Sequence, residues 1–181
     1  MAAAGTVRLR ALLAQRGRGR GGAQPGLPGL GGADHLVVTP GNETDFNHIE
    51  SDILDLCRRY RVVSVGFDPW QSTQMAQRLR AEGVNMLEFR ATTQNFSPAM
   101  VELDAAMRSG RLRHDGDPVL GWCVGNVVGR PDRRGNLYPA KQRPKQKIDA
   151  AVELMMAVGR AMAEDGKPDF GEFVRNAIIV Y

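Results

Sequence analysis

Residues 62–70 read VVSVGFDPW, and this stretch decides how the rest of the chain is interpreted. Its mostly apolar run predicts a buried strand that ends at a single acid, Asp68. Pro69 and Trp70 follow directly, and an Asp-Pro pair commonly opens a turn. Asp68 therefore has two interpretations at this point. It is either the cap of a following helix or a carboxylate ligand for a metal ion.

Apolar spacing predicts alternating strands and helices around this stretch. The expected strands are 35–39, 61–67, 84–89 and 118–128, the last as one strand or as two with a bulge at a glycine. The expected helices are 46–60 after Asp45 as cap, 72–82 ended by Gly83, Pro98 to Gly110 after Ser97 as N-cap, and 148–162. Residues 132–136, DRRGN, are expected to form a turn. This order predicts an α/β domain with some parallel pairing, in which ligands gather beyond the carboxyl ends of strands, where Asp68 lies.

Three regions differ in composition. Residues 1–33 are rich in Gly, Arg and Pro, hold five arginines and no acid, and are expected to be a disordered tail. The folded domain is expected over 34–163, and 164–181 is expected to be a C-terminal extension. Of the 24 basic residues, 19 remain in 34–181 against 20 acids, so the net charge of +4 comes from the tail.

Other site classes find little support in the sequence. Cys57 and Cys123 are far apart and form no CxxC pattern, which argues against a zinc site and a disulfide framework. No apolar run is long enough to span a membrane. Because the two cysteines form no disulfide framework, a reducing, cytoplasmic setting is expected, and no membrane contact is expected.

A second acid and a dense group of basic residues lie together near the last helix. Asp149 is in the first turn of an otherwise apolar helix, where the plain interpretation is compensation of the helix dipole. Just before it, residues 130–147 carry a net charge of +6, and we call their seven cations the basic strip. Its members are Arg130, Arg133, Arg134, Lys141, Arg143, Lys145 and Lys147. Carboxylates hold Mg²⁺ or Mn²⁺ and basic side chains hold phosphates, so this pattern favours a phosphodiester site over a merely solvated loop.

Four stretches resemble the C-terminal nuclease domain of tailed-phage terminase large subunits, the proteins that package phage DNA. They are HLVVTPGNETDFNHIESDI, VGFDPWQSTQMAQRLRAEG, FSPAMVELDAAMRSGRLRHDGDPVLGWCVGNVV and KIDAAVELMMAVGRAM. They follow one another in the family order and cover about two-thirds of the chain.

The resemblance implies a ribonuclease-H-like fold and Mg²⁺- or Mn²⁺-dependent cutting of double-stranded DNA, with three acids binding two metal ions. Asp68 is similar to the second of these acids and Asp149 to the third, while Lys147 stands where the family carries a lysine. His114 and Asn126 match a further family pattern and are expected to assist at the site. DNA, the terminase small subunit and the portal are the implied partners.

One departure from the family changes the expectation. The family's first acid lies on a strand upstream of residues 35–39, where this chain has RGRGRGGAQPGLPGLGGA and no acid before Asp34. A Walker A pattern is also missing. We therefore expect a fold incomplete at its N-terminal strands, from a truncated or shifted reading frame, with weak or no nuclease activity. Two alternatives stay open: a non-enzymatic fragment that binds DNA or the packaging complex, and another ribonuclease-H-like enzyme such as a junction resolvase.

Overall fold

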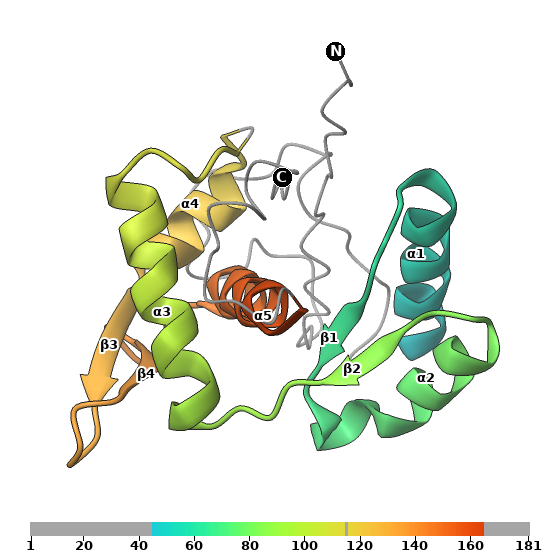
Figure 1. Ribbon diagram of the computed structural model, residues 1–181, viewed down its shortest axis with the longest axis horizontal. Helices are drawn as coiled ribbons and strands as arrows, with labels where there is room; N and C mark the ends of the chain where they lie inside the picture. The colour runs from blue at the N-terminus through green and yellow to red at the C-terminus, as the bar shows by residue number, and fades with distance from the viewer. Residues whose placement is uncertain (1–44, 115, 165–181) are drawn as a thin grey trace.

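The computed structural model describes residues 45–114 and 116–164. The elements of this part, shown in Figure 1, are α1 (Phe46–Arg59), β1 (Val65–Phe67), α2 (Pro69–Ala81), β2 (Met86–Glu88), α3 (Thr93–Arg108), α4 (Pro118–Gly125), β3 (Val127–Pro131), β4 (Leu137–Lys141) and α5 (Asp149–Glu164). The expected strand 35–39 and both terminal segments lie outside these residues. No helix of the described part is long and apolar enough to cross a membrane.

The first lobe consists of α1, β1, α2 and β2. Its two strands pair in parallel, with Val65 opposite Met86 and Phe67 opposite Glu88, which confirms the predicted parallel pairing. The Asp45 carboxylate accepts hydrogen bonds from the first turn of α1, as predicted, and α2 ends before Gly83, whose φ of 87° suits a residue without a side chain. Phe67, Leu79 and Met86 belong to the small core of this lobe.

The second lobe consists of α3, α4, the β3–β4 hairpin and α5. Its core is larger, with Phe96, Leu103, Val119, Leu154 and Val158 almost fully buried. The hairpin is antiparallel and turns at Asp132–Asn136, where the Asp132 carboxylate accepts hydrogen bonds from the backbone of Arg134 and Asn136. The predicted turn at 132–136 is therefore confirmed.

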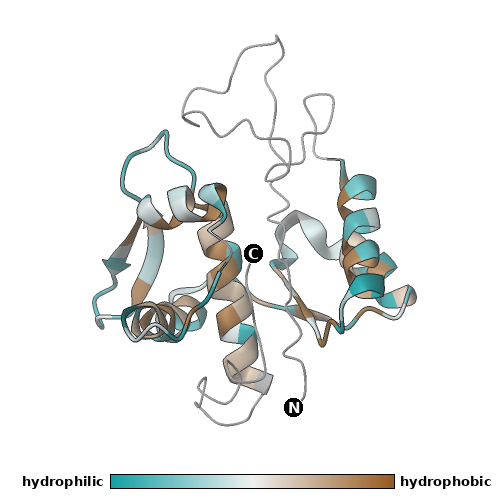
Figure 2. Ribbon diagram, turned by 90° about the horizontal axis from the view of Figure 1, so that it is seen from above, coloured by the Kyte–Doolittle hydropathy of each residue, from teal (hydrophilic) through white to brown (hydrophobic). Residues whose placement is uncertain are grey.

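Helix α5 lies on the side of the second lobe that faces β1 (Figure 1), and Figure 2 shows it as largely hydrophobic. The sequence predicts Ile148, Val152, Met155, Met156 and Gly159 as its buried side. Ile148 and Met155 are buried, but the other three are only partly buried, whereas Ala150, Ala151, Leu154, Val158 and Ala161 are also buried. A helix packed from two sides buries a wider part of its circumference than a surface helix does, so one apolar stripe underestimates its core face.

The beginning of α3 differs from the prediction. The helix begins at Thr93, the Thr92 hydroxyl accepts a hydrogen bond from the amide of Asn95, and Pro98 lies inside the helix. Because Thr92 already provides the cap, Ser97 is free to accept a hydrogen bond from the amide of Leu137, which ties α3 to β4. Helical spacing of apolar residues predicts that Met107 lines the core, but Met107 is 40% exposed and its neighbour Ala106 is buried instead.

The predicted strand 118–128 is wrong over most of its length. Residues 118–125 form the helix α4, capped by the Asp117 carboxylate with Pro118 in the first turn, and β3 begins only at Val127. The helix is apolar on nearly all sides, so it has no helical period that the sequence pattern could reveal. Strand β4 was not predicted, and β1 covers only the end of the predicted strand 61–67.

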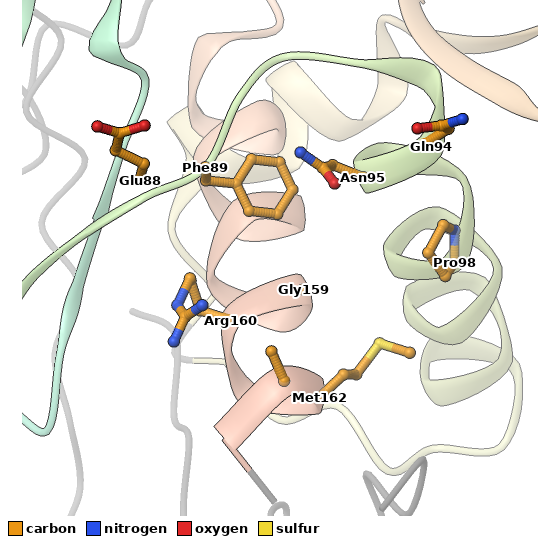
Figure 3. Close-up of a pocket in the computed structure, with 9 residues that line it drawn as sticks. Glu88, Phe89, Gln94, Asn95, Pro98, Gly159, Arg160 and Met162 are labelled. Atoms are coloured by element: carbon orange, nitrogen blue, oxygen red, sulfur yellow. The ribbon is translucent and has the colours of Figure 1, made fainter. Parts of the chain in front are cut away.

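Gly159 allows a close approach that tests the position of α5. A Cβ atom added there would lie 2.6 Å from Cε2 of Phe89, a contact that Figure 3 helps to follow. We expect Gly159→Ala to lower the free energy of unfolding by about 1–3 kcal/mol through overpacking. Gly121→Ala is the matched control, because its Cβ would meet nothing within 4 Å and alanine favours a helix. Urea denaturation should show a lower midpoint for the first variant only; equal midpoints would contradict the packing described here.

Candidate functional site

Asp68 lies between β1 and α2, at the carboxyl end of the strand. Its Oδ1 accepts a hydrogen bond from the amide of Trp70 at 3.1 Å, and its backbone carbonyl accepts one from the Ser72 hydroxyl. The helix-cap interpretation of Asp68 is therefore confirmed. Capping uses one carboxylate oxygen, and the second oxygen has no hydrogen-bond partner among the described residues, so the metal-ligand prediction is compatible with the cap.

Asp149 is the first residue of α5 and is exposed. Strand β1 approaches α5 further along the helix, where a Cβ atom added to Gly66 would lie 3.0 Å from Cγ of Arg160. Asp149 precedes Arg160 by eleven residues, or about 16 Å of helix axis. At Gly66, β1 therefore approaches the half of α5 that is remote from Asp149.

The described residues contain no group of three or more His, Cys, Asp or Glu side chains that could hold a metal ion. Asp68 and Asp149 supply carboxylate oxygens, the donors that Mg²⁺ and Mn²⁺ prefer, but they stand on different elements without a third ligand in this part of the chain. The two carboxylates thus have the donor atoms that a divalent metal ion prefers, but the described residues supply too few ligands to form a complete site.

The basic strip follows the β3–β4 hairpin and the loop that leads into α5. Arg133 and Arg134 lie in the turn of the hairpin, Lys141 ends β4, and the remaining members flank these positions. All seven side chains are exposed, and none of them forms an ion pair in the described part of the chain. The loop itself is ordered by hydrogen bonds such as that from the Arg143 amide to Oε1 of Gln146 at 2.7 Å.

The two auxiliary residues have different surroundings. His114 is exposed, and its Nδ1 accepts a hydrogen bond from the amide of Gly116. Asn126 is only 5% exposed, and its Nδ2 donates a hydrogen bond to the backbone carbonyl of Lys147 at 3.0 Å. The backbone carbonyl of Asn126 accepts a hydrogen bond from the amide of Gln142. Asn126 therefore fixes the residue two positions before Asp149, and it acts on the candidate site through the backbone.

Two titratable groups lie near the beginning of α5. Burial raises the pKa of the Cys123 thiol, which outweighs the lowering by the amides of Ala150 and Ala151, so this cysteine is a core residue. Desolvation by neighbouring protein atoms and, second, the charge of Asp149 raise the pKa of Glu153 to about 8; the residue is nevertheless exposed, so solvent screening reduces this effect. Glu153 was not singled out in the sequence. Its spacing of four residues from Asp149, which places both acids on one helix face, was the available signal.

A cavity at the junction of the lobes is separate from these residues. Glu88, Asn95, Pro98 and Arg160 are among its lining residues, and Figure 3 shows them around the end of α5. None of the predicted site residues lines this cavity.

Comparisons with known proteins agree with this architecture. Residues 35–165 match the family described as terminase large subunit, endonuclease domain. A curated relative, the terminase large subunit of Enterobacteria phage HK97, is 32% identical over 143 residues, which are 77% of this chain and 28% of that protein. Protein YmfN of Escherichia coli K12 is 36% identical over 143 residues, which cover 78% of this chain and 31% of YmfN. The chain thus spans about a third of the length of these relatives.

Two solved structures have the same fold. The crystal structure of the HK97 large terminase matches with a TM-score of 0.63 and 31% identity over 69% of this chain and 26% of that one. The large terminase nuclease of thermophilic phage G20c matches with a TM-score of 0.54 and 18% identity over 64% of this chain and 62% of that one.

The fold therefore defines a ribonuclease-H-like nuclease domain of the α/β class, which confirms the predicted fold class. Within this class, the chain belongs to the terminase large subunit nuclease family.

The role of Asn126 can be separated from that of His114. We expect Asn126→Ala to lower the free energy of unfolding by about 1–3 kcal/mol, because the Lys147 carbonyl loses its partner next to a buried position. His114→Ala, at an exposed position, should change stability by no more than about 0.5 kcal/mol. Chemical denaturation of both variants decides, and an unchanged midpoint for Asn126→Ala would show that this hydrogen bond does not hold the loop.

The raised pKa of Glu153 predicts a pH dependence of stability. An unfolded glutamate titrates near its ordinary value of about 4.3, whereas the folded group titrates at about 8. The folded chain thus binds this proton more tightly, and the resulting stabilisation is lost as the pH rises from about 4.3 through 8. The check is to measure the urea midpoints of wild type and Glu153→Gln at pH 5 and at pH 9. The midpoint of the variant should fall less between the two pH values than that of wild type, because glutamine does not ionise. An identical loss in both proteins would contradict the assigned pKa.

Proposed function

We propose that this chain supplies the nuclease part of a terminase large subunit and acts on double-stranded DNA during phage DNA packaging. The observation that carries the proposal is the family match over residues 35–165, which includes both Asp68 at the end of β1 and Asp149 at the start of α5. Cleavage would be endonucleolytic hydrolysis of a phosphodiester bond. We place it in the cytoplasm of the bacterial host, with the terminase small subunit and the portal as further partners.

The basic strip supports DNA as the substrate. Seven exposed cations on one hairpin and its following loop, with no acid paired to them among the described residues, form a surface that attracts a polyanion. Contacts of this kind position the DNA backbone without reading its sequence. In this proposal Lys141, Arg143, Lys145, Lys147, Arg133 and Arg134 hold phosphates, and the Asn126 contact fixes the backbone at Lys147.

Mg²⁺ or Mn²⁺ is the cofactor proposed with this function. Asp68 and Asp149 are the residues that would hold it, and the metal would supply charge to activate water at neutral pH. Because the described residues offer no third ligand, we propose that the 181-residue chain by itself binds the metal weakly and cuts DNA slowly or not at all. A second candidate is a non-enzymatic protein that binds DNA or the packaging complex. It is favoured by the lack of a third metal ligand among the described residues and by the exposed basic strip.

Nicking of supercoiled plasmid with Mg²⁺ or Mn²⁺ tests the enzymatic part. We expect little or no nicking; robust cutting that disappears in Asp68→Asn and Asp149→Ala would overturn the proposed impairment and establish both acids as catalytic. Asp68→Asn is the sharper variant because asparagine is an equally good helix cap, so α2 stays intact. Calorimetry with Mn²⁺ on wild type and Asp68→Asn gives a readout that does not depend on turnover.

Fluorescence anisotropy of a labelled duplex tests the binding part. We expect Lys147→Ala to weaken binding in a salt-dependent manner and to reduce the slope of log affinity against log salt by about 0.9. Arg58→Ala on α1, outside the basic strip, is the matched control. Equal slopes for wild type, Lys147→Ala and Arg58→Ala would contradict the proposed interface. In the same assay, tighter binding of branched than of linear duplex would favour a junction resolvase.

A further inference from the structure

Trp70 stands out on the surface of the first lobe. It is 79% exposed, more than any other large hydrophobic side chain in the described residues. The other tryptophan, Trp122, packs against the core of the second lobe. An indole left in water is a large apolar surface without a contact, and tryptophans in such positions are frequent at recognition sites.

The backbone that carries Trp70 is held in place by the first turn of α2. The amide of Trp70 donates to the Asp68 carboxylate at 3.1 Å, and the Thr73 hydroxyl donates to the Pro69 carbonyl at 2.9 Å. Pro69 in the first turn further restricts the chain. The indole is thus presented from a fixed position two residues from Asp68.

The surroundings of Trp70 favour a nucleobase over a protein surface as its partner. Residues three, four and seven positions along α2 share its helix face, and these are Thr73, Gln74 and Gln77, all exposed and polar. A protein-docking site brings several apolar side chains together in one patch. Base stacking requires a single aromatic ring, tolerates polar neighbours and works with any base.

We propose that Trp70 stacks on an unpaired nucleobase of the DNA next to the site of cutting. The proposal rests on the proposed DNA substrate and adds a contact that the basic strip does not provide. Bases inside a duplex are already stacked on their neighbours, so the free π-face that Trp70 needs occurs at a nick, a frayed end or an overhang. Trp70 is in this proposal a positioning residue, because it holds DNA beside Asp68 without touching the scissile phosphate.

The two tryptophans allow a direct test with the full chain in EDTA, where no cutting occurs. Trp122→Phe leaves Trp70 as the only tryptophan, and Trp70→Phe leaves Trp122. The probes are a duplex with a single-stranded overhang and the same duplex with abasic overhang residues. We expect the fluorescence of Trp70 to be quenched by the first duplex and much less by the second, whereas the fluorescence of Trp122 stays unchanged with both.

Anisotropy of the same labelled duplexes gives the second measurement and keeps the test valid if Trp122→Phe folds poorly. Wild type should bind the intact overhang at least about fivefold more tightly than the abasic one, and Trp70→Ala should abolish this difference while keeping the salt dependence. Val101→Ala, which alters another exposed apolar side chain, should keep the difference. Salt-dependent binding without quenching or discrimination overturns the inference alone. Absence of DNA binding by every protein overturns the proposed function and the inference together.

Discussion

The lack of a side chain at Gly159 is the constraint on which the arrangement of the two lobes depends. At this position α5 approaches the ring of Phe89, which follows β2, and a Cβ atom would also lie 3.4 Å from the Cβ of Ala99 on α3. The next residue, Arg160, lies against Gly66 of β1. One turn of α5 therefore packs closely against α3 of its own lobe and against β1 of the first lobe, and both approaches occur at glycines. The position of Asp149 at the other end of the same helix follows from this contact.

The sequence predicted those elements whose ends carry their own local signals. Asp45 caps the beginning of α1, and Gly83, with its left-handed backbone, follows the end of α2. Both effects act within one helical turn. The Asp117-Pro118 pair opens α4 in the same way as Asp68-Pro69 opens α2, but the even apolarity of 118–125 hid the helix behind it. Ser97-Pro98 has the same appearance and caps nothing, because Thr92 is placed earlier and takes the role.

The types of candidate site residues could be predicted, whereas their grouping could not. Asp68 at the end of a strand and Asp149 at the start of a helix follow from local pattern, since strand and helix ends are marked in sequence. Whether they meet depends on the crossing of β1 and α5, which is set by Gly66, Phe89 and Gly159 far away in the chain. Asn126 illustrates the same limit, because its hydrogen bond to Lys147 spans 21 positions.

Charged residues are used differently in different parts of the molecule. Within the lobes, several cations have acidic partners, as in Arg78 with Glu50 at 2.7 Å and Arg111 with Glu102 at 2.8 Å. The basic strip has no such partners among the described residues. Its cations repel one another on a short hairpin, and hydrogen bonds of the turn and loop hold the backbone against that repulsion. Such a surface has a positive potential that attracts anions.

The helix cap formed by Asp68 has an evolutionary consequence. The Asp68 carboxylate holds the first turn of α2, so a substitution that removes the side-chain oxygen also removes a helix cap. Selection for folding alone would therefore retain an oxygen-bearing residue at this position after selection for catalysis had ceased. Asp149, exposed and without a hydrogen-bond partner among the described residues, has no comparable protection and would be free to drift. In descendants of an inactive copy, we thus expect the two acids to be lost at different rates, with Asp149 the first to change.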